Sequence, residues 1–531
     1  LNSIKVKLKT DKFNKYLISR YTQLKRKYRK LVRLKNKEFK ASMLKKISEI
    51  SNQNPRAMWN VVKKLRAKKQ QNIPITLEEF KEYYESLLNT KSEHTANPKL
   101  NQYLKSLLAK KTQDSIFDEE ISFKELKQAT DKLKARVASG EDLISSEMIK
   151  NSINSCAPTF LKLFNHILNC ETIPTQWGLG YMTPIPKSGD LSEVNNYRGL
   201  TVSSCLSKLF FHIVNNRIIT FLDKNSKISE FQIGFKSGCR TSDHIFVLKT
   251  LIDVYKKRQK KLYACFVDLR KAYDSVWHPG LFIKLLKIGI SPKIIRLIQD
   301  LYSKSKTCIK LDNKLSDYFQ ISLGVRQGCV LSPILFNIYI NGLVRSLSNV
   351  CSSPAVLGHL KVPILMYADD IILLSESPVG LQNSMNSLQL YCKTWKLRVN
   401  TSKTKVIIFN SRSSAGYNFK IGQHAIEMVK QYCYLGVTVH QSGNFKMAWE
   451  ILVNKGAKAY AALHNVFNIY HGCPVKIMLK LIEALVEPVM LYCCEIWGGY
   501  MVKKMTNLEN LFFNFSLPFQ KLFIRMCKQI L

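Results

Sequence analysis

The chain has 531 residues, of which 46% are hydrophobic and 10% aromatic, which is enough to build the cores of two or three domains and excludes a largely disordered protein. Lysine and arginine total 81 against 38 aspartates and glutamates, so the formal net charge of +43 favours a polyanionic partner such as nucleic acid. No uninterrupted apolar run approaches the roughly 20 residues of a membrane-spanning helix, so no membrane partner is expected.

Residues 1–117 are expected to form a basic helical region that ends in a polar linker. Between residues 5 and 46, leucines and tyrosines recur at roughly helical spacing among basic side chains, which predicts a long basic helix. A solvated helix face is one interpretation, and we favour contact with phosphates, because each neutralised phosphate adds affinity. The candidate nucleic-acid-binding residues are Lys25, Arg26, Lys27, Arg29 and Lys30. A shorter helix is expected over residues 77–88.

Helices and strands are mixed between residues 118 and 440, which is typical of an α+β domain. Helices are expected over residues 122–134 and 146–168. Strands are expected over residues 181–186, 262–269, 307–311, 364–374 (as a hairpin) and 405–409. The region 441–531 is expected to be helical, over residues 448–470, 475–492 and 508–531. The 14 cysteines are scattered without the C-x-x-C spacing of a zinc site, so they are expected to be reduced thiols.

Asp369 and Asp370 are adjacent acids between two apolar runs, residues 364–366 and 371–374. Apolar strands around a short polar tip predict a tight β-hairpin. Two carboxylates forced together are costly to ionise unless a cation neutralises them. Mg²⁺ prefers oxygen ligands and keeps positions open for substrate phosphates, so a magnesium site is expected at this turn.

Asp268 follows the apolar residues 262–267 and is expected at the end of a strand, where both turn residues and catalytic groups occur. We interpret it as the third acid of the site, although only the fold can bring it to the hairpin. The candidate catalytic and metal-binding acids are therefore Asp268, Asp369 and Asp370. Three carboxylates in a basic chain predict two-metal phosphoryl transfer, and specifically nucleotide polymerisation.

Three segments around these acids carry a family resemblance. They are Phe266-Val267-Asp268 with Ala272-Tyr273-Asp274, Gly324-Val325-Arg326-Gln327-Gly328-Cys329 with Leu331-Ser332-Pro333, and Tyr367-Ala368-Asp369-Asp370. In this order they resemble reverse transcriptases of non-LTR (LINE-type) retrotransposons. Further segments match upstream, at residues 139–142, 184–187, 196–198 and 232–244, and downstream, at residues 397–404 and 434–436. The resemblance covers about residues 118–440 strongly and the helical tail loosely.

The resemblance implies a right-hand polymerase, with fingers and palm over 118–440, a helical thumb over 441–531 and a basic helical N-terminal extension. It implies RNA-templated DNA synthesis with two Mg²⁺ ions, for which Mn²⁺ is a possible substitute. Lys187 and Arg198 would bind the triphosphate, and Tyr273 would block a ribose 2′-hydroxyl. Gln327 and Gly328 would form a turn against the incoming nucleotide. Lys403 is a candidate to protonate the leaving pyrophosphate, and neighbouring Lys405 competes for that role.

By the same resemblance, the partners would be the element's RNA as template, a DNA primer or target, and dNTPs. The expected location is the nucleus, with a cytoplasmic ribonucleoprotein stage, and the sequence leaves the oligomeric state unknown. Gly199 and Val330 depart from the residues more usual in the family. The region before residue 118 is too short and basic for the family's endonuclease. We therefore expect a fragment that lacks the endonuclease domain.

Two alternatives to reverse transcription stay open on the sequence alone. An RNA-dependent RNA polymerase shares the carboxylate hairpin but normally lacks an aromatic gate such as Tyr273. A binding protein, either a maturase-like RNA-binding protein or a decayed and inactive copy of an element, would keep affinity for RNA without turnover.

Overall fold

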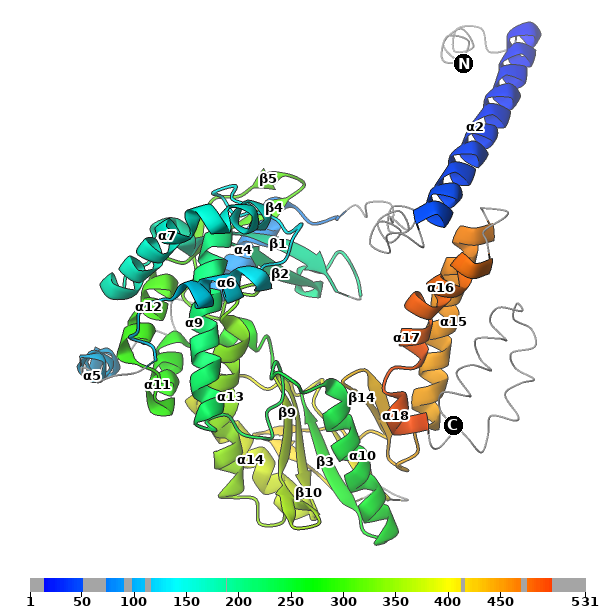
Figure 1. The fold of residues 1–531 in the computed structure, drawn as a ribbon. Coiled ribbons are helices and arrows are strands. Elements are labelled where there is room, and N and C mark those ends of the chain that lie inside the picture. Colours follow the sequence, from blue (N-terminus) through cyan, green and yellow to red (C-terminus); the bar gives the residue numbers. More distant parts are fainter. Residues whose placement is uncertain are drawn as a thin grey trace. The chain divides into compact units, whose positions relative to one another are not determined.

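The computed structural model describes residues 14–50, 73–89, 98–109, 116–187, 189–411, 416–468 and 475–498. The chain divides into two compact units (Figure 1). One unit spans Asn72–Asn444, and the other combines Leu1–Gln71 with Phe445–Leu531. The helix expected over residues 508–531 lies outside the described residues, as do residues 5–13 of the basic segment.

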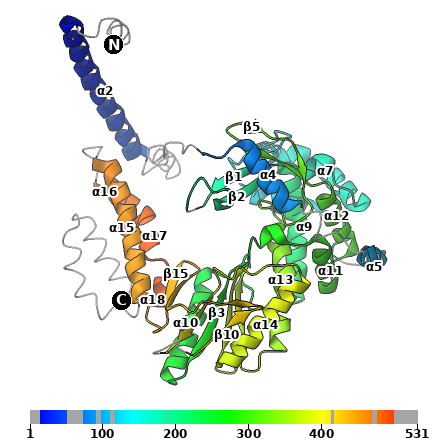
Figure 2. The same cartoon turned by 180° about the vertical axis from the view of Figure 1, so that it is seen from behind.

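The sheet that carries the three acids has four antiparallel strands in the order β11-β3-β10-β9. These are β3 (Leu262–Val267), β9 (Ile364–Tyr367), β10 (Asp370–Ser375) and β11 (Lys405–Phe409). All residues of β3 are buried, which explains why its sequence is a continuous apolar run without alternation. Helices α10 (Thr241–Lys257) and α14 (Pro378–Thr394) pack against this palm sheet (Figure 2). The predicted strands and hairpin are confirmed here.

A second sheet has the order β2-β1-β4-β5, with β6 also paired to β4. Its strands are β1 (Leu179–Pro186), β2 (Tyr197–Val202), β4 (Lys306–Leu311), β5 (Lys314–Leu315) and β6 (Phe319–Gln320). Strand β1 runs antiparallel to β2 and parallel to β4. We refer to this sheet as the fingers sheet.

Helix α4 (Leu77–Leu88) is an integral part of the larger unit and matches the predicted helix. It starts with a capping box, in which the Thr76 side chain accepts the Glu79 N–H and the Glu79 carboxylate accepts the Thr76 N–H, which satisfies two backbone donors at the helix start. Its buried residues Phe80, Tyr84 and Leu88 share one core with residues of the fingers sheet. The helix therefore covers that sheet.

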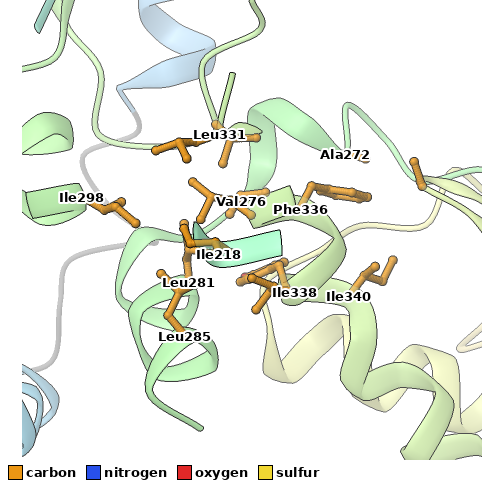
Figure 3. Close-up of a cluster of buried hydrophobic side chains, with 14 of the residues drawn as sticks. Ile218, Ala272, Val276, Leu281, Leu285, Ile298, Leu331, Phe336, Ile338 and Ile340 are labelled. Carbon is orange, nitrogen blue, oxygen red and sulfur yellow. The ribbon is translucent and has the colours of Figure 1, made fainter. Parts of the chain in front are cut away.

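The largest core is formed by helices of the larger unit together with strands of the palm sheet, and Figure 3 shows part of it. Among its contributors are α9 (Cys205–Lys224), α11 (His278–Ile288), α12 (Pro292–Ser303) and α13 (Ser332–Ser348). Ile218 of α9, Leu281 of α11 and Phe336 of α13 are each fully buried in it. Further helices of this unit are α5 (Pro98–Leu108), α6 (Phe123–Lys132), α7 (Ser146–Cys170), α8 (Thr175–Gly178) and the short 3₁₀ helices η1 (Val194–Asn196) and η2 (Tyr273–Ser275). The two helices predicted at 122–134 and 146–168 correspond to α6 and α7.

The described part of this unit also holds three small two-stranded hairpins, which the sequence pattern did not predict as strands. They are β7–β8 (Ala355–Leu357 and Leu360–Val362), β12–β13 (Lys420–Ile421 and His424–Ala425) and β14–β15 (Gln431–Tyr434 and Val437–His440). All are antiparallel pairs of only two to four residues a strand, too short for an alternating pattern to stand out.

The second unit is helical where it is described. Its helices are α2 (Lys15–Ile50), α15 (Lys446–Asn468), α16 (Val475–Leu485), α17 (Glu487–Met490) and α18 (Cys494–Trp497). The single helix predicted over 475–492 is wrong: α16 ends at Leu485 and α17 begins with Pro488 in its first turn, because proline cannot donate the hydrogen bond that would continue a helix. None of the described helices is both long and apolar enough to cross a membrane.

Candidate active site

A cavity of about 810 Å³ in the larger unit collects most of the predicted site residues on its walls. The predicted residues that line it are Lys187, Arg198, Asp268, Tyr273, Gln327, Gly328, Asp369 and Lys403. They come from β2 and the residue after β1, the segment from the end of β3 to η2, the segment before α13, the β9–β10 turn and the segment before β11. Asp370, the third predicted acid, does not line the cavity.

The palm sheet brings the three acids to one end. In the antiparallel register Ile371 pairs with Val267, so the next positions along the two strands are Asp370 and Asp268. Directly opposed residues of an antiparallel pair lie on the same face and close together. Asp369, in the turn before β10, lines the cavity together with Asp268.

The acids repel one another in this arrangement. The pKa of Asp369 is raised, first by burial, and the charge of Asp268 adds to the effect. Although Asp370 retains solvent exposure, partial burial and the charges of Asp369 and Asp268 raise its pKa to about 6. The carboxylates are thus close enough to hinder each other's ionisation, which a cation would relieve.

The donor set fits a divalent cation, since carboxylate oxygens are the ligands that hard cations prefer. Among the described residues, however, no group of three or more His, Cys, Asp or Glu side chains is arranged to hold a metal ion. The side chains of the three acids therefore do not converge on one point as they stand. Their roles as metal ligands stay predictions.

Asp268 is fixed by the segment before β11. Its backbone N–H donates to Thr404 Oγ1 at 3.2 Å, and its backbone carbonyl accepts the Asn400 N–H at 2.8 Å. The Asn400 side chain donates from Nδ2 to Asp268 Oδ2 at 2.9 Å. Asn400 and Thr404 lie in the segment 397–404, which stands out in the sequence only by its family resemblance. The sequence therefore did not predict that they orient Asp268. Lys403, between them, lines the cavity.

A buried glutamine, Gln232, stabilises the turn that carries Asp369. Ala368 has the left-handed φ of +55°, which is unfavourable for residues with a Cβ atom. Gln232 is fully buried, and its Oε1 accepts the N–H of Ala368 at 3.0 Å and of Gly234 at 2.9 Å. A Cβ atom on Gly234 would lie 2.3 Å from the backbone nitrogen of Ala368. Gln232 and Gly234 therefore position the acidic turn.

Residues 185–439 match the family model described as reverse transcriptase (RNA-dependent DNA polymerase). The chain contains a reverse transcriptase domain. The RNA-directed DNA polymerase from mobile element jockey of Drosophila funebris is 26% identical over 392 residues, which cover 71% of this chain and 41% of that protein. The probable RNA-directed DNA polymerase from transposon BS of Drosophila melanogaster is 25% identical over 464 residues, 83% of this chain and 50% of that protein.

A Pol polyprotein from a type-1 R2 element of Popillia japonica is 29% identical over 233 residues, 44% of this chain and 32% of that protein. The reverse transcriptase match over residues 185–439 and these relatives support the predicted family, the reverse transcriptases of LINE-type elements, and the observed helices and sheets confirm the α+β class. The chain spans at most 50% of the length of these relatives. A telomerase from Candida tropicalis superposes with a TM-score of 0.37 at 12% identity over 70% of this chain and 61% of that one, too weak a likeness to carry an argument.

Tyr273 of the reverse transcriptase domain lies on the cavity wall with its ring stacked on Phe336, at 4.6 Å between centroids and 16° between planes. Its hydroxyl is buried without a hydrogen-bond partner, and burial raises its pKa above the ordinary tyrosine value. Packing on Phe336 of α13 therefore fixes the ring on the cavity wall, and its role as a sugar gate stays a prediction.

The turn at Gln327 and Gly328 joins this wall to the fingers sheet. Gln327 donates from Nε2 to Asp274 Oδ1 at 2.7 Å, and its carbonyl accepts the Thr201 N–H at 2.8 Å. Gly328 has a φ of +111°, and a Cβ atom there would lie 2.4 Å from the carbonyl oxygen of Thr201. Only glycine combines that backbone conformation with that close approach.

Lys187 and Arg198 line the wall of this cavity that is next to the fingers sheet. The pKa of Lys187 is lowered, first by burial and then by the charge of Arg198. Two cations held near each other favour an anionic ligand between them. Their expected role with a triphosphate stays a prediction.

The basic residues singled out in the N-terminal region lie on α2, in the other compact unit. Lys25, Arg26, Lys27, Arg29 and Lys30 are all exposed. Lys25 lies over the Tyr21 ring, 5.6 Å from its centroid. The helix thus presents cations to solvent, and its binding of nucleic acid stays a prediction.

Proposed function

We propose that the protein copies RNA into DNA as the RNA-directed DNA polymerase of a LINE-type element. The single observation that carries the proposal is the shared cavity of a reverse transcriptase domain, in which Asp268 and Asp369 face the cations Lys187, Arg198 and Lys403. Nucleotidyl transfer requires carboxylates that bind metal ions and basic side chains that bind phosphates. This cavity holds both kinds of side chain.

Asp268, Asp369 and Asp370 would hold two divalent cations, Mg²⁺ by preference and Mn²⁺ as a substitute. When bound, such ions supply activation of the primer 3′-hydroxyl and neutralisation of charge on the transferring phosphate. Lys187 and Arg198 would bind and orient the triphosphate, because phosphoryl transfer depends mostly on positioning and electrostatic stabilisation. Lys403 would give a proton to the leaving pyrophosphate.

The primary test is extension of a DNA primer on an RNA template by the purified 531-residue chain, with dNTPs and Mg²⁺. The proposal requires extension that stops when dNTPs are omitted. An RNA-only binding protein, such as a maturase-like protein or a decayed copy, would bind the duplex without extending it. Absence of extension under all metal conditions would overturn the proposal.

Sugar selection separates reverse transcription from RNA synthesis. The Tyr273 ring is fixed against Phe336, so replacing it by Ala or Val opens space beside the nucleotide without changing a charged group. We expect Tyr273→Ala to raise the efficiency of rNTP over dNTP incorporation by about 10- to 200-fold, since discrimination by a steric contact is worth about 1–3 kcal/mol. Single-nucleotide incorporation kinetics measure this ratio. Wild-type protein that prefers rNTPs would support the RNA polymerase instead.

Metal binding should compete with protons at the acidic cluster. Asp370 has a pKa of about 6 in the folded protein, above the value of about 4 for an unfolded carboxyl group. The folded state therefore binds the proton more tightly, so without metal the stability falls as the pH rises through this window. We expect Mg²⁺ to raise the melting temperature more at pH 8 than at pH 5, compared with EDTA. An equal effect at both pH values would contradict a site made of these acids.

The basic helix should make RNA binding dependent on salt. Replacing Lys25, Arg26, Lys27, Arg29 and Lys30 by Ala should flatten the plot of log affinity against log salt by up to about 3.5, at about 0.7 for each single-stranded phosphate contact. Filter binding over a salt titration measures the slope. Lys314→Ala with Lys361→Ala, two exposed lysines of β5 and β8, is the control. An unchanged slope in the α2 variant would remove α2 from the binding surface.

In the cell, the template would be the element's own RNA and the primer a 3′ end of nicked target DNA. The nick would come from an endonuclease outside this domain. Synthesis would take place in the nucleus after a cytoplasmic ribonucleoprotein stage. The role of an element RNA as template is supported by the relatives, which are RNA-directed DNA polymerases of mobile elements.

A further inference from the structure

Helix α4 contributes Tyr83, Tyr84 and Leu87 to the walls of the same cavity, although it lies ahead of residues 185–439, which match the reverse transcriptase family. Its buried face packs on the fingers sheet, and the Leu88 carbonyl at its end accepts the N–H groups of Ser322 and Leu323 at 2.9 and 3.1 Å. The helix is therefore held at both its side and its end. Tyr83, on the adjacent face, lines the cavity.

Tyr83 forms a three-residue cluster with Asn195 of η1 and Lys271, which follows Asp268 in the palm. The Tyr83 hydroxyl donates to Asn195 Oδ1 at 2.8 Å and accepts a hydrogen bond from Lys271 Nζ. Lys271 Nζ also donates to Asn195 Oδ1 at 3.3 Å and lies 4.4 Å from the centroid of the Tyr83 ring. The Lys271 ammonium group is thus held by two segments, α4 and η1, that are remote from it in sequence.

The ammonium group is fixed without being neutralised by this cluster. Its partners Tyr83 and Asn195 are uncharged, and the Tyr83 hydroxyl stays protonated because burial raises its pKa to about 12. An ammonium group has three N–H donors, and Tyr83 and Asn195 take two of them. Lys271 lines the cavity, so the third donor is available to an anion there.

The surroundings of Lys271 have an excess of positive charge. Asp274 is the nearby acid, and burial raises its pKa while the charges of Lys271, Lys187 and Arg198 lower it. Three cations therefore lie within electrostatic reach of one buried carboxyl group, which also accepts a hydrogen bond from Gln327. A wall with this balance binds a multiply charged anion better than a single phosphate of a nucleic-acid backbone.

We propose that Lys271 binds the triphosphate of the incoming nucleotide, and that Tyr83 and Asn195 are positioning residues that hold its ammonium group in place. Helix α4 is then part of the nucleotide-binding site. The inference rests on the proposed polymerase function and adds a triphosphate-binding cation and its support to that site.

The test is a double-mutant cycle on the full chain, with single-nucleotide incorporation on an RNA template. Tyr83→Phe keeps the ring and its packing but removes the oxygen that accepts from Lys271, and we expect the KM for dNTP to rise about five-fold with kcat nearly unchanged. Lys271→Ala should raise KM by about 10-fold or more, because it removes a charged partner. Tyr83→Phe should add nothing in the Lys271→Ala background.

Tyr84→Phe is the matched control, because it removes the neighbouring phenol hydroxyl of α4, which is buried without a hydrogen-bond partner. A KM effect of Tyr83→Phe that persists in full without Lys271 would overturn the positioning role. A rise in the dissociation constant for the RNA template, with KM for dNTP unchanged, would assign Lys271 to the template backbone instead.

A second readout separates this proposal from the proposed function. On a primer with a terminated 3′ end, a matched dNTP should stabilise the complex of protein, primer and template against salt. With Lys271→Ala, the same stabilisation should need a dNTP concentration about 10-fold higher. This expectation holds whether or not the wild-type protein extends primers. If the wild type and the variant need the same dNTP concentration for stabilisation, the proposal is refuted.

Discussion

Asp369→Asn should reduce nucleotide incorporation by at least about 1,000-fold while leaving the affinity for RNA unchanged. The substitution keeps the shape of the side chain and removes one charge from the acids at the end of the palm sheet. Electrostatic stabilisation of a transferring phosphate is commonly the largest contribution to catalysis, and loss of a single such group costs about 10²–10³ in kcat. A metal ligand at the reacting centre should cost at least as much.

The same variant should be at least as stable as the wild type in EDTA. In the folded protein the pKa of Asp369 is raised by burial and by Asp268, and Asp369 in turn raises the pKa of Asp370. Removing its charge relieves both effects. Thermal melting in EDTA therefore separates loss of catalysis from loss of fold, and a lower melting temperature would contradict this account.

Asp317→Asn is the control for Asp369→Asn. The Asp317 side chain is 91% exposed and pairs with Lys81 at 3.0 Å, an arrangement that contributes little to stability. It should leave primer extension unchanged. Asp369→Asn with more than a tenth of wild-type activity would show that the turn acid is not essential and would remove the basis of the two-metal assignment.

Local pattern was sufficient to predict the elements that carry the acids. The apolar run before Asp268 and the two runs around Asp369 and Asp370 became β3, β9 and β10, because strands buried on both faces leave a continuous apolar signature. The strand over 405–409 has the predicted bounds, and so has the helix from Leu77 to Leu88. The predicted polymerase family followed from the order of the motifs.

The supports of the site could not be predicted, because they depend on contacts between remote segments. Gln232 holds the turn at Ala368, 136 residues away in sequence, and Asn400 orients Asp268 across 132 residues. Tyr83 meets Lys271 across 188 residues. A glutamine, an asparagine or a tyrosine is an ordinary residue in its own segment, and only the fold gives it a partner.

Gly234→Ala should have the second-largest effect, through the position of the acidic turn. The new Cβ atom would lie 2.3 Å from the backbone nitrogen of Ala368, so either the turn or the Gln232 segment must move. Displacement of a catalytic group by about 1 Å costs roughly 100-fold in rate, and we expect a loss of this size in kcat. Overpacking should also reduce stability by about 1–3 kcal/mol.

Gly358→Ala provides the contrast needed to interpret that loss. Gly358 has a φ of +61° with no atom within 4 Å of an added Cβ, so alanine there introduces backbone strain of about 1–2 kcal/mol in the β7–β8 turn without touching the β9–β10 turn. The two variants should lose similar stability by chemical denaturation, whereas only Gly234→Ala should lose primer extension. If Gly234→Ala keeps the wild-type kcat, the acidic turn does not depend on close packing against residue 234. The role assigned to the Gln232 segment would then be wrong.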